Sequence, residues 1–279
     1  MPNPILNDKN FEEARAGWAA PTAPSAGGEV WAPPTTAPVD DGPISPWRPG
    51  MMTVGGAITA TAVLFVLLLA SATVGWLATD GVTVGPDGQE QFRFPPLAFL
   101  GVIVGLVSVI ALYFKPQLAR FLGPVYALAQ GFFLGAISKA YETFYDGIVL
   151  QAAGATLAVF AVMLALYHTR IIKVTDRFRR TVIFATLGVM ALYLVSIVMS
   201  LFGAQVPFIH DASVIGILFS VFVCGLAAVN LALDFDFIER GARAGLAKDY
   251  EWVAAVGLLV TIIWLYLEIL RLLAKLREN

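Results

Sequence analysis

Two acidic side chains stand out because each is embedded in long apolar sequence. Asp234 closes the charge-free run 212–233, and Glu268 interrupts apolar sequence that continues through Leu270. An ionisable group at membrane depth costs roughly 2.5–3.5 kcal/mol on insertion scales, so such groups usually serve a function. Two carboxyl groups sharing one buried site cannot both ionise cheaply, so the pair would hold a single proton and respond to pH. Because calcium prefers oxygen ligands, Asp234 and Glu268 are the candidate pH sensor and gate, and a candidate calcium path.

Each acid also has an interpretation without such a role. Asp234 could mark a helix end at the membrane surface, and Glu268 could pair with Arg271 one helical turn away. The two acids are 34 residues apart, so they lie level only if the helix holding Asp234 continues past Arg240 toward Lys248 before the chain turns. The stretch 241–245 contains two glycines and permits that continuation without requiring it.

A cluster of charged residues follows Asp234 directly. We expect these side chains to line the cytoplasmic mouth of the site and to pair with the two acids: Asp236, Glu239, Arg240 and Arg243.

No other sequence pattern indicates a catalytic, nucleotide-binding or metal-binding site. Neither histidine belongs to an HExxH motif, and no GxSxG, P-loop or GxGxxG signature is present. Cys224 lies in a charge-free run, and we interpret it as a small buried apolar residue. We therefore expect no enzyme activity and no cofactor, with calcium as a permeant ion. The net charge of −2 sits in segregated loops and gives no indication of nucleic-acid binding.

The elements that would position these acids are long apolar helices. The chain has 279 residues, of which 58% are hydrophobic and 14% charged, against about 25% charged in a soluble domain. A run of about 18 or more apolar residues can cross roughly 30 Å of hydrocarbon as a helix, which satisfies its own backbone hydrogen bonds. The sequence therefore predicts an all-α polytopic membrane protein, a seven-transmembrane-helix bundle over residues 51–279. The expected spans are 51–78, 94–114, 122–141, 147–168, 180–203, 212–235 and 250–275.

Residues 1–50 differ from the rest of the chain. They hold ten of the sixteen prolines and few residues that could form a core, which predicts a disordered cytoplasmic tail or, alternatively, a partner-binding segment. Loop charges place the N-terminus in the cytoplasm by the positive-inside rule. A complete last span would put the C-terminal cations 271, 275 and 277 on the other side, so the sequence leaves open whether that segment crosses fully.

Two pairs of glycines four residues apart lie inside predicted spans. They are Gly101 with Gly105 and Gly131 with Gly135. Small residues at this spacing let helix backbones approach closely, so we expect tight helix pairs there.

These features together resemble the Bax inhibitor-1 family of multipass membrane proteins. The resemblance rests on the small-residue-rich third-span stretch 123–138, on the last-helix stretch 265–270 (LYLEIL), and on the acidic end of span six. The proline-rich tail resembles the bacterial, actinobacterial-type branch. Glu268 stands where the family usually has aspartate, and Gln130 stands where related third-span motifs often have an acid.

The resemblance implies a bundle around a central last helix in a bacterial cell membrane. It also implies a pH-sensitive calcium leak, with Asp234 and Glu268 as the sensing pair, and an association with suppression of stress-induced death. The alternative is a non-conducting regulator that binds another membrane protein, such as a membrane protease. The lipid bilayer is therefore the partner that the sequence predicts most directly. The sequence does not indicate the oligomeric state.

Overall fold

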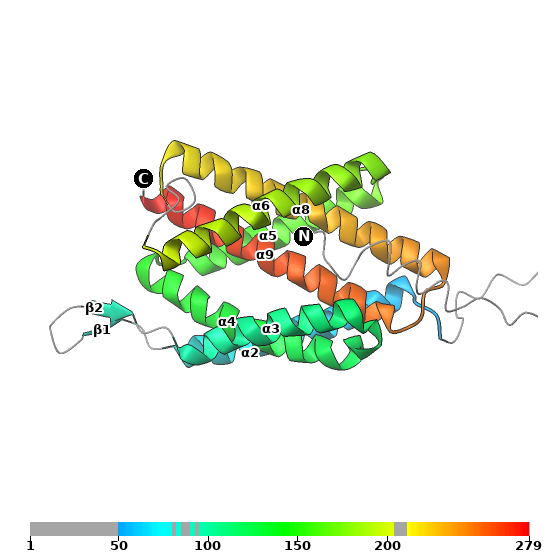
Figure 1. Ribbon diagram of the computed structural model, residues 1–279, viewed down its shortest axis with the longest axis horizontal. Coiled ribbons are helices and arrows are strands. Elements are labelled where there is room, and N and C mark those ends of the chain that lie inside the picture. Colours follow the sequence, from blue (N-terminus) through cyan, green and yellow to red (C-terminus); the bar gives the residue numbers. More distant parts are fainter. Residues whose placement is uncertain (1–49, 80–81, 85–89, 93–94, 204–210, 279) are drawn as a thin grey trace, which may run out of the picture.

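The computed structural model describes residues 50–79, 82–84, 90–92, 95–203 and 211–278 (Figure 1). Nearly all of the predicted N-terminal tail, residues 1–49, lies outside the described residues.

The described residues form seven helices that are long and apolar enough to cross a membrane, as the sequence predicts. They are α2 (Val54–Leu77), α3 (Pro96–Phe114), α4 (Ala119–Phe144), α5 (Ile148–His168), α6 (Asp176–Leu201), α8 (Val214–Ala244) and α9 (Tyr250–Glu278). A 3-10 turn, η1 (Pro116–Leu118), leads into α4. Two short antiparallel strands, β1 (Val82–Val84) and β2 (Glu90–Phe92), lie between α2 and α3 and were not expected.

Helix α8 is longer than the sequence indicated. It continues to Ala244 instead of ending near residue 235. Gly245 stops it with a left-handed backbone, φ 68°, which glycine adopts at helix C-termini without steric strain. Asp234 therefore lies well inside a helix and not at its end.

Helix α9 is the centre of the bundle. In its membrane-crossing window 78% of residues are buried, against 22% to 44% in the other six helices. Figure 1 shows α9 running between α2, α3 and α4 on one side and α5, α6 and α8 on the other. Helices α2, α4, α5 and α8 pack on α9 directly, whereas α3 packs on α4 and α6 on α8. Side chains on α9 are thus the ones best shielded from lipid.

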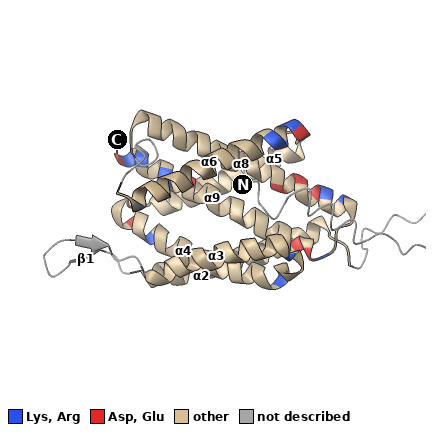
Figure 2. Ribbon diagram, in the orientation of Figure 1, with Lys and Arg blue, Asp and Glu red and all other residues tan. Residues whose placement is uncertain are grey.

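The outer surface is apolar and suits a hydrocarbon solvent. Ile103 of α3 is 58% exposed and Ile197 of α6 is 60% exposed. Lys, Arg, Asp and Glu gather toward the two ends of the bundle (Figure 2). We call the end that carries Gly50, the α5–α6 loop and the α8–α9 turn the basic end. The other end carries β1, β2 and the C-terminus.

The glycine pairs bring α2, α3 and α4 into backbone contact. A Cβ at Gly135 would lie 1.9 Å from the Ala72 carbonyl oxygen of α2, and one at Gly131 would lie 2.4 Å from that of Leu68. Gly101 of α3 faces the backbone of Ala129 on α4 in the same way. The predicted close approach is confirmed, and these glycine faces are used inside the bundle.

A buried carboxylate ties the start of α2 to the start of α9. Glu251 is 5% exposed and accepts hydrogen bonds from the backbone N–H and the hydroxyl of Thr53, both 2.9 Å long. Thr53 in turn caps α2 by accepting from the Gly56 N–H. Met52 donates its N–H to the Leu246 carbonyl in the α8–α9 turn. The entry to α2 is therefore fixed against the central helix.

The cations near the C-terminus find partners at the end opposite the basic end. Lys275 is 3% exposed and donates to the Gly216 carbonyl at the start of α8 and to the Ser220 hydroxyl. Arg277 donates to the Asp146 carbonyl and the Gln151 side chain. Helix α9 thus runs antiparallel to α8 from end to end, and it is long and apolar enough to cross a membrane.

The glycine contact generates a stability prediction. Gly135→Ala places a methyl group against the Ala72 backbone, which cannot move aside as a flexible side chain could. We expect a loss of about 1–3 kcal/mol, the usual cost of overpacking, measured as a lower Tm of the detergent-solubilised protein. Gly154→Ala is the matched control, because a Cβ there meets nothing within 4 Å. Equal Tm values for the two variants would contradict backbone contact between α2 and α4.

Candidate functional site

Asp234 lies on the inward face of α8, shielded from solvent and lipid. It is 3% exposed, and its carboxyl group is hydrogen-bonded to Thr261 of α9. Its Oδ2 atom is buried and has no hydrogen-bond partner among the described residues. None of the ion pairs in the described part of the chain includes Asp234. A buried carboxyl group in this position is stable when it holds a proton or a cation and costly when it holds neither.

Glu268 lies on the same central helix in a fully bonded environment. It is 2% exposed and accepts from the Tyr193 hydroxyl of α6 at 2.8 Å and from Trp264 Nε1 at 3.3 Å. Arg271 donates to both of its oxygens, at 3.2 and 3.3 Å, and forms the ion pair that the sequence offered as an alternative. Arg271 also donates to the Tyr193 hydroxyl at 2.8 Å and lies 5.0 Å from that ring's centroid.

The structure does not bring the two acids together in one hydrogen-bonded pair. Asp234 is level with Thr261, and Thr261 precedes Glu268 by seven residues. At a rise of about 1.5 Å per residue, the two levels differ by roughly 10 Å along α9. The expectation of a shared proton required α8 to continue past Arg240 toward Lys248, and α8 does pass Arg240 but ends at Ala244. Asp234 and Glu268 are therefore two separate buried sites. Asp234 lies between α8 and α9, and Glu268 lies further along α9, toward the C-terminal end of the bundle.

The four predicted mouth residues do meet, but they pair with each other and with neighbouring helices instead of with the two buried acids. Asp236 accepts from Arg179 of α6 at 2.8 Å and pairs with Arg240 at 2.9 Å. Glu239 accepts a 2.5 Å hydrogen bond from the Tyr167 hydroxyl of α5 and pairs with Arg243. With Arg179 and Tyr167 they form a ring of paired charges that joins α5, α6 and α8 at the basic end.

Sequence reasoning missed several groups that complete the site. Tyr193 and Arg179 come from α6 and are invisible without the tertiary contacts. The polar face of α9 could have been recognised, because Glu268, Arg271 and Lys275 recur at spacings of three and four residues, which is one face of a helix. That face carries three bonded charged side chains between the level of Asp234 and the C-terminal end of the bundle.

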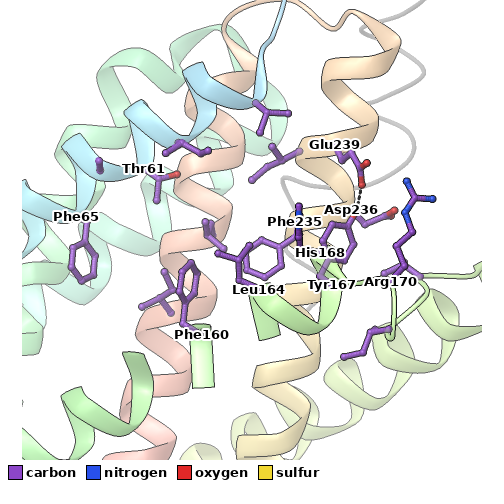
Figure 3. A pocket seen from close by; sticks show the side chains of 18 of the residues that line it. Thr61, Phe65, Phe160, Leu164, Tyr167, His168, Arg170, Phe235, Asp236 and Glu239 are labelled. Carbon is purple, nitrogen blue, oxygen red and sulfur yellow. Dashed lines mark hydrogen bonds between the residues drawn. The ribbon is translucent and has the colours of Figure 1, made fainter. Parts of the chain in front are cut away.

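A large cavity opens beside this site at the basic end. It has a volume of about 1020 Å³ and lies among α2, α5, α8 and α9. Figure 3 shows the rings of Phe65, Phe160 and Phe235 around it, with Arg170 at one end. Its walls are mostly apolar, and its polar residues gather toward the ring of charges around Glu239.

Within the stretches that the structure describes, no three His, Cys, Asp or Glu side chains lie together in an arrangement that could hold a metal ion.

Comparison with known proteins gives one family. The family model described as Bax inhibitor 1 like matches residues 3–278. No curated protein is similar enough to the chain to add to that match. The match takes in all seven helices, the central α9 and both buried acids. The chain therefore belongs to the Bax inhibitor 1 like family.

Proposed function

We propose that this protein forms a proton-sensitive cation leak through its membrane, with calcium as a permeant ion. The observation that supports the proposal is the buried Oδ2 of Asp234, which has no hydrogen-bond partner among the described residues. A proton on Asp234 would leave the site neutral, and its loss would leave a negative site that attracts a cation. The membrane we propose is a bacterial cell membrane, with the N-terminus and the basic end in the cytoplasm.

In this proposal the two acids act in series. A cation enters at the basic end and passes Asp236 and Glu239, each of which is paired with an arginine. It then reaches Asp234. Further along α9 it meets Glu268, whose negative charge is offset by Arg271 at 3.2 Å. The ion pair and Tyr193 close the path there, because a cation must displace Arg271 to approach Glu268. Asp234 is thus the sensor, and the Glu268–Arg271–Tyr193 cluster is the gate.

The alternative is a non-conducting regulator that binds another membrane protein. Its candidate surfaces are the N-terminal tail and the glycine pairs of α3 and α4. Because the glycine pairs contact α2 and α4 inside the bundle, the tail is the surface left to this alternative.

The leak proposal predicts distinct effects of the two acids on flux. We expect Asp234→Asn to bring the ratio of calcium flux at pH 8 to flux at pH 6 to about one, because the amide cannot change charge. Glu268→Gln leaves the charge of Arg271 uncompensated, so it should lower flux at both pH values. Flux is measured in liposomes with a calcium-sensitive dye inside. The control is Asp211→Asn, an exposed acid. An unchanged pH ratio and flux in both buried variants would reject the gating role.

Deleting residues 1–45 separates the two proposals. A leak formed by the seven helices should keep its flux in liposomes, since the deletion leaves Met52 and Thr53 in place to fix α2. A regulator should lose its partner when the tail is removed, with no flux in either form. Loss of calcium flux on deletion, with an unchanged Tm, would contradict a pore confined to the helices.

A further inference from the structure

We propose that the cavity among α2, α5, α8 and α9 binds one anionic phospholipid of the leaflet at the basic end. One acyl chain occupies the apolar part, and Arg170 and Lys173 bind the phosphate headgroup. This inference does not depend on the leak, and it concerns residues that the leak mechanism does not use.

The cavity is shaped to be entered from the side. Helices α2 and α5 flank it and pack on α9 in preference to each other. Its rim carries Ile58 of α2, 62% exposed, and Leu157 of α5, 57% exposed, while Leu258 of α9 forms a buried floor. A cavity of about 1020 Å³ is at the upper end of the usual size for a ligand site, roughly 300–1000 Å³. In a bilayer such an opening faces acyl chains, so hydrocarbon is the occupant that the surroundings supply.

The apolar walls cannot select a lipid, because lipid tails are as apolar as the side chains. Selection must come from the polar end, where Arg170 and Lys173 follow α5. Neither side chain makes a hydrogen bond or ion pair with another residue that the structure describes. Arg170 acts electrostatically on Glu239, but that carboxylate is already bonded to Tyr167 and Arg243. The mouth of the cavity therefore carries positive charge that its own acids do not balance.

The backbone at Arg170 gives an independent reason. Its φ is 56°, the only positive φ of a non-glycine residue in the described stretches. After a helix such as α5, this left-handed position is usually taken by glycine, since other residues are strained there. Strained residues of this kind cluster at ligand sites. The left-handed turn after α5 brings Arg170 to the mouth of the cavity, where its guanidinium group can form two parallel hydrogen bonds with a phosphate.

The occupant that fits both ends is an amphiphile with a hydrocarbon chain and an anionic head. Anionic lipids gather in the cytoplasmic leaflet, where each nearby Lys or Arg favours them. The basic end is where we place the cytoplasm, so the location agrees with the charge. A zwitterionic lipid with the same chains would fill the cavity equally well but would gain less from Arg170 and Lys173.

The test compares phosphatidylglycerol with phosphatidylcholine of identical acyl chains. The full-length protein in detergent is titrated with each lipid, and bound lipid is counted by native mass spectrometry. We expect an affinity for phosphatidylglycerol higher by roughly tenfold or more, given two basic contacts. Glycerol phosphate without acyl chains should not compete, which separates a lipid site from a phosphate site. Competition by glycerol phosphate, or equal affinity for the two lipids, would overturn the proposal.

Two variants and one control locate the site. Arg170→Gln combined with Lys173→Gln should bring the affinity ratio close to one. The control combines Arg177→Gln with Arg180→Gln, which removes the same charge from exposed positions at the same end of the bundle, outside the cavity lining. If the control lowers the ratio as much, general surface charge is responsible and the proposal fails.

Arg170→Gly separates binding from folding. Glycine relieves the left-handed backbone strain, so the Tm without added lipid should stay equal or rise. The preference for phosphatidylglycerol should nevertheless fall. A variant that keeps the full preference would show that the strained arginine does not hold the headgroup.

Discussion

The burial of α9 inside the bundle is the constraint on which the rest of the structure depends. A polar group within hydrocarbon must find its partner inside the protein, because lipid offers none. Most of the polar side chains on and around α9 obey this rule. Glu251 binds the Thr53 cap, Glu268 binds Arg271 and Tyr193, and Lys275 binds a carbonyl and a hydroxyl of α8. These bonds also tie α9 to three other helices, so the same interactions that satisfy buried charge position the central helix.

Asp234 departs from that rule, and this is why it carries the functional proposal. One of its oxygens is buried with no hydrogen-bond partner among the described residues. Among the buried acids that the structure describes, Glu251 and Glu268 are bonded, whereas Asp234 keeps one oxygen without a partner, and we propose that a proton or a cation comes and goes there. Glu268 differs because its charge is already balanced. The two buried acids thus lie at different levels and in different surroundings, and we propose different tasks for them.

Features that depend on local sequence can be predicted from it, whereas features that depend on how two helices align in the fold cannot. The seven helices follow from hydrocarbon thickness, which fixes the length of an apolar run. The glycine contacts follow from spacing alone, because a missing Cβ exposes the backbone. The Glu268–Arg271 pair follows from helical periodicity. The level of Asp234 against α9 does not follow, because stretch 241–245 allows α8 to end at more than one residue. A shift of two turns there separates the acids by roughly 10 Å. The role of Tyr193 depends on how α6 packs and leaves no mark in the sequence.

The protonation state of Asp234 tests the central claim most directly. Infrared difference spectra of the protein in liposomes, between about pH 6 and pH 8, report a protonated carboxyl group as a carbonyl band distinct from that of a carboxylate. The account predicts a pH-dependent band that is present in the native protein, absent in Asp234→Asn and retained in Glu268→Gln. A spectrum with no such band, or one that Asp234→Asn leaves unchanged, would contradict the assignment of Asp234 as the proton site.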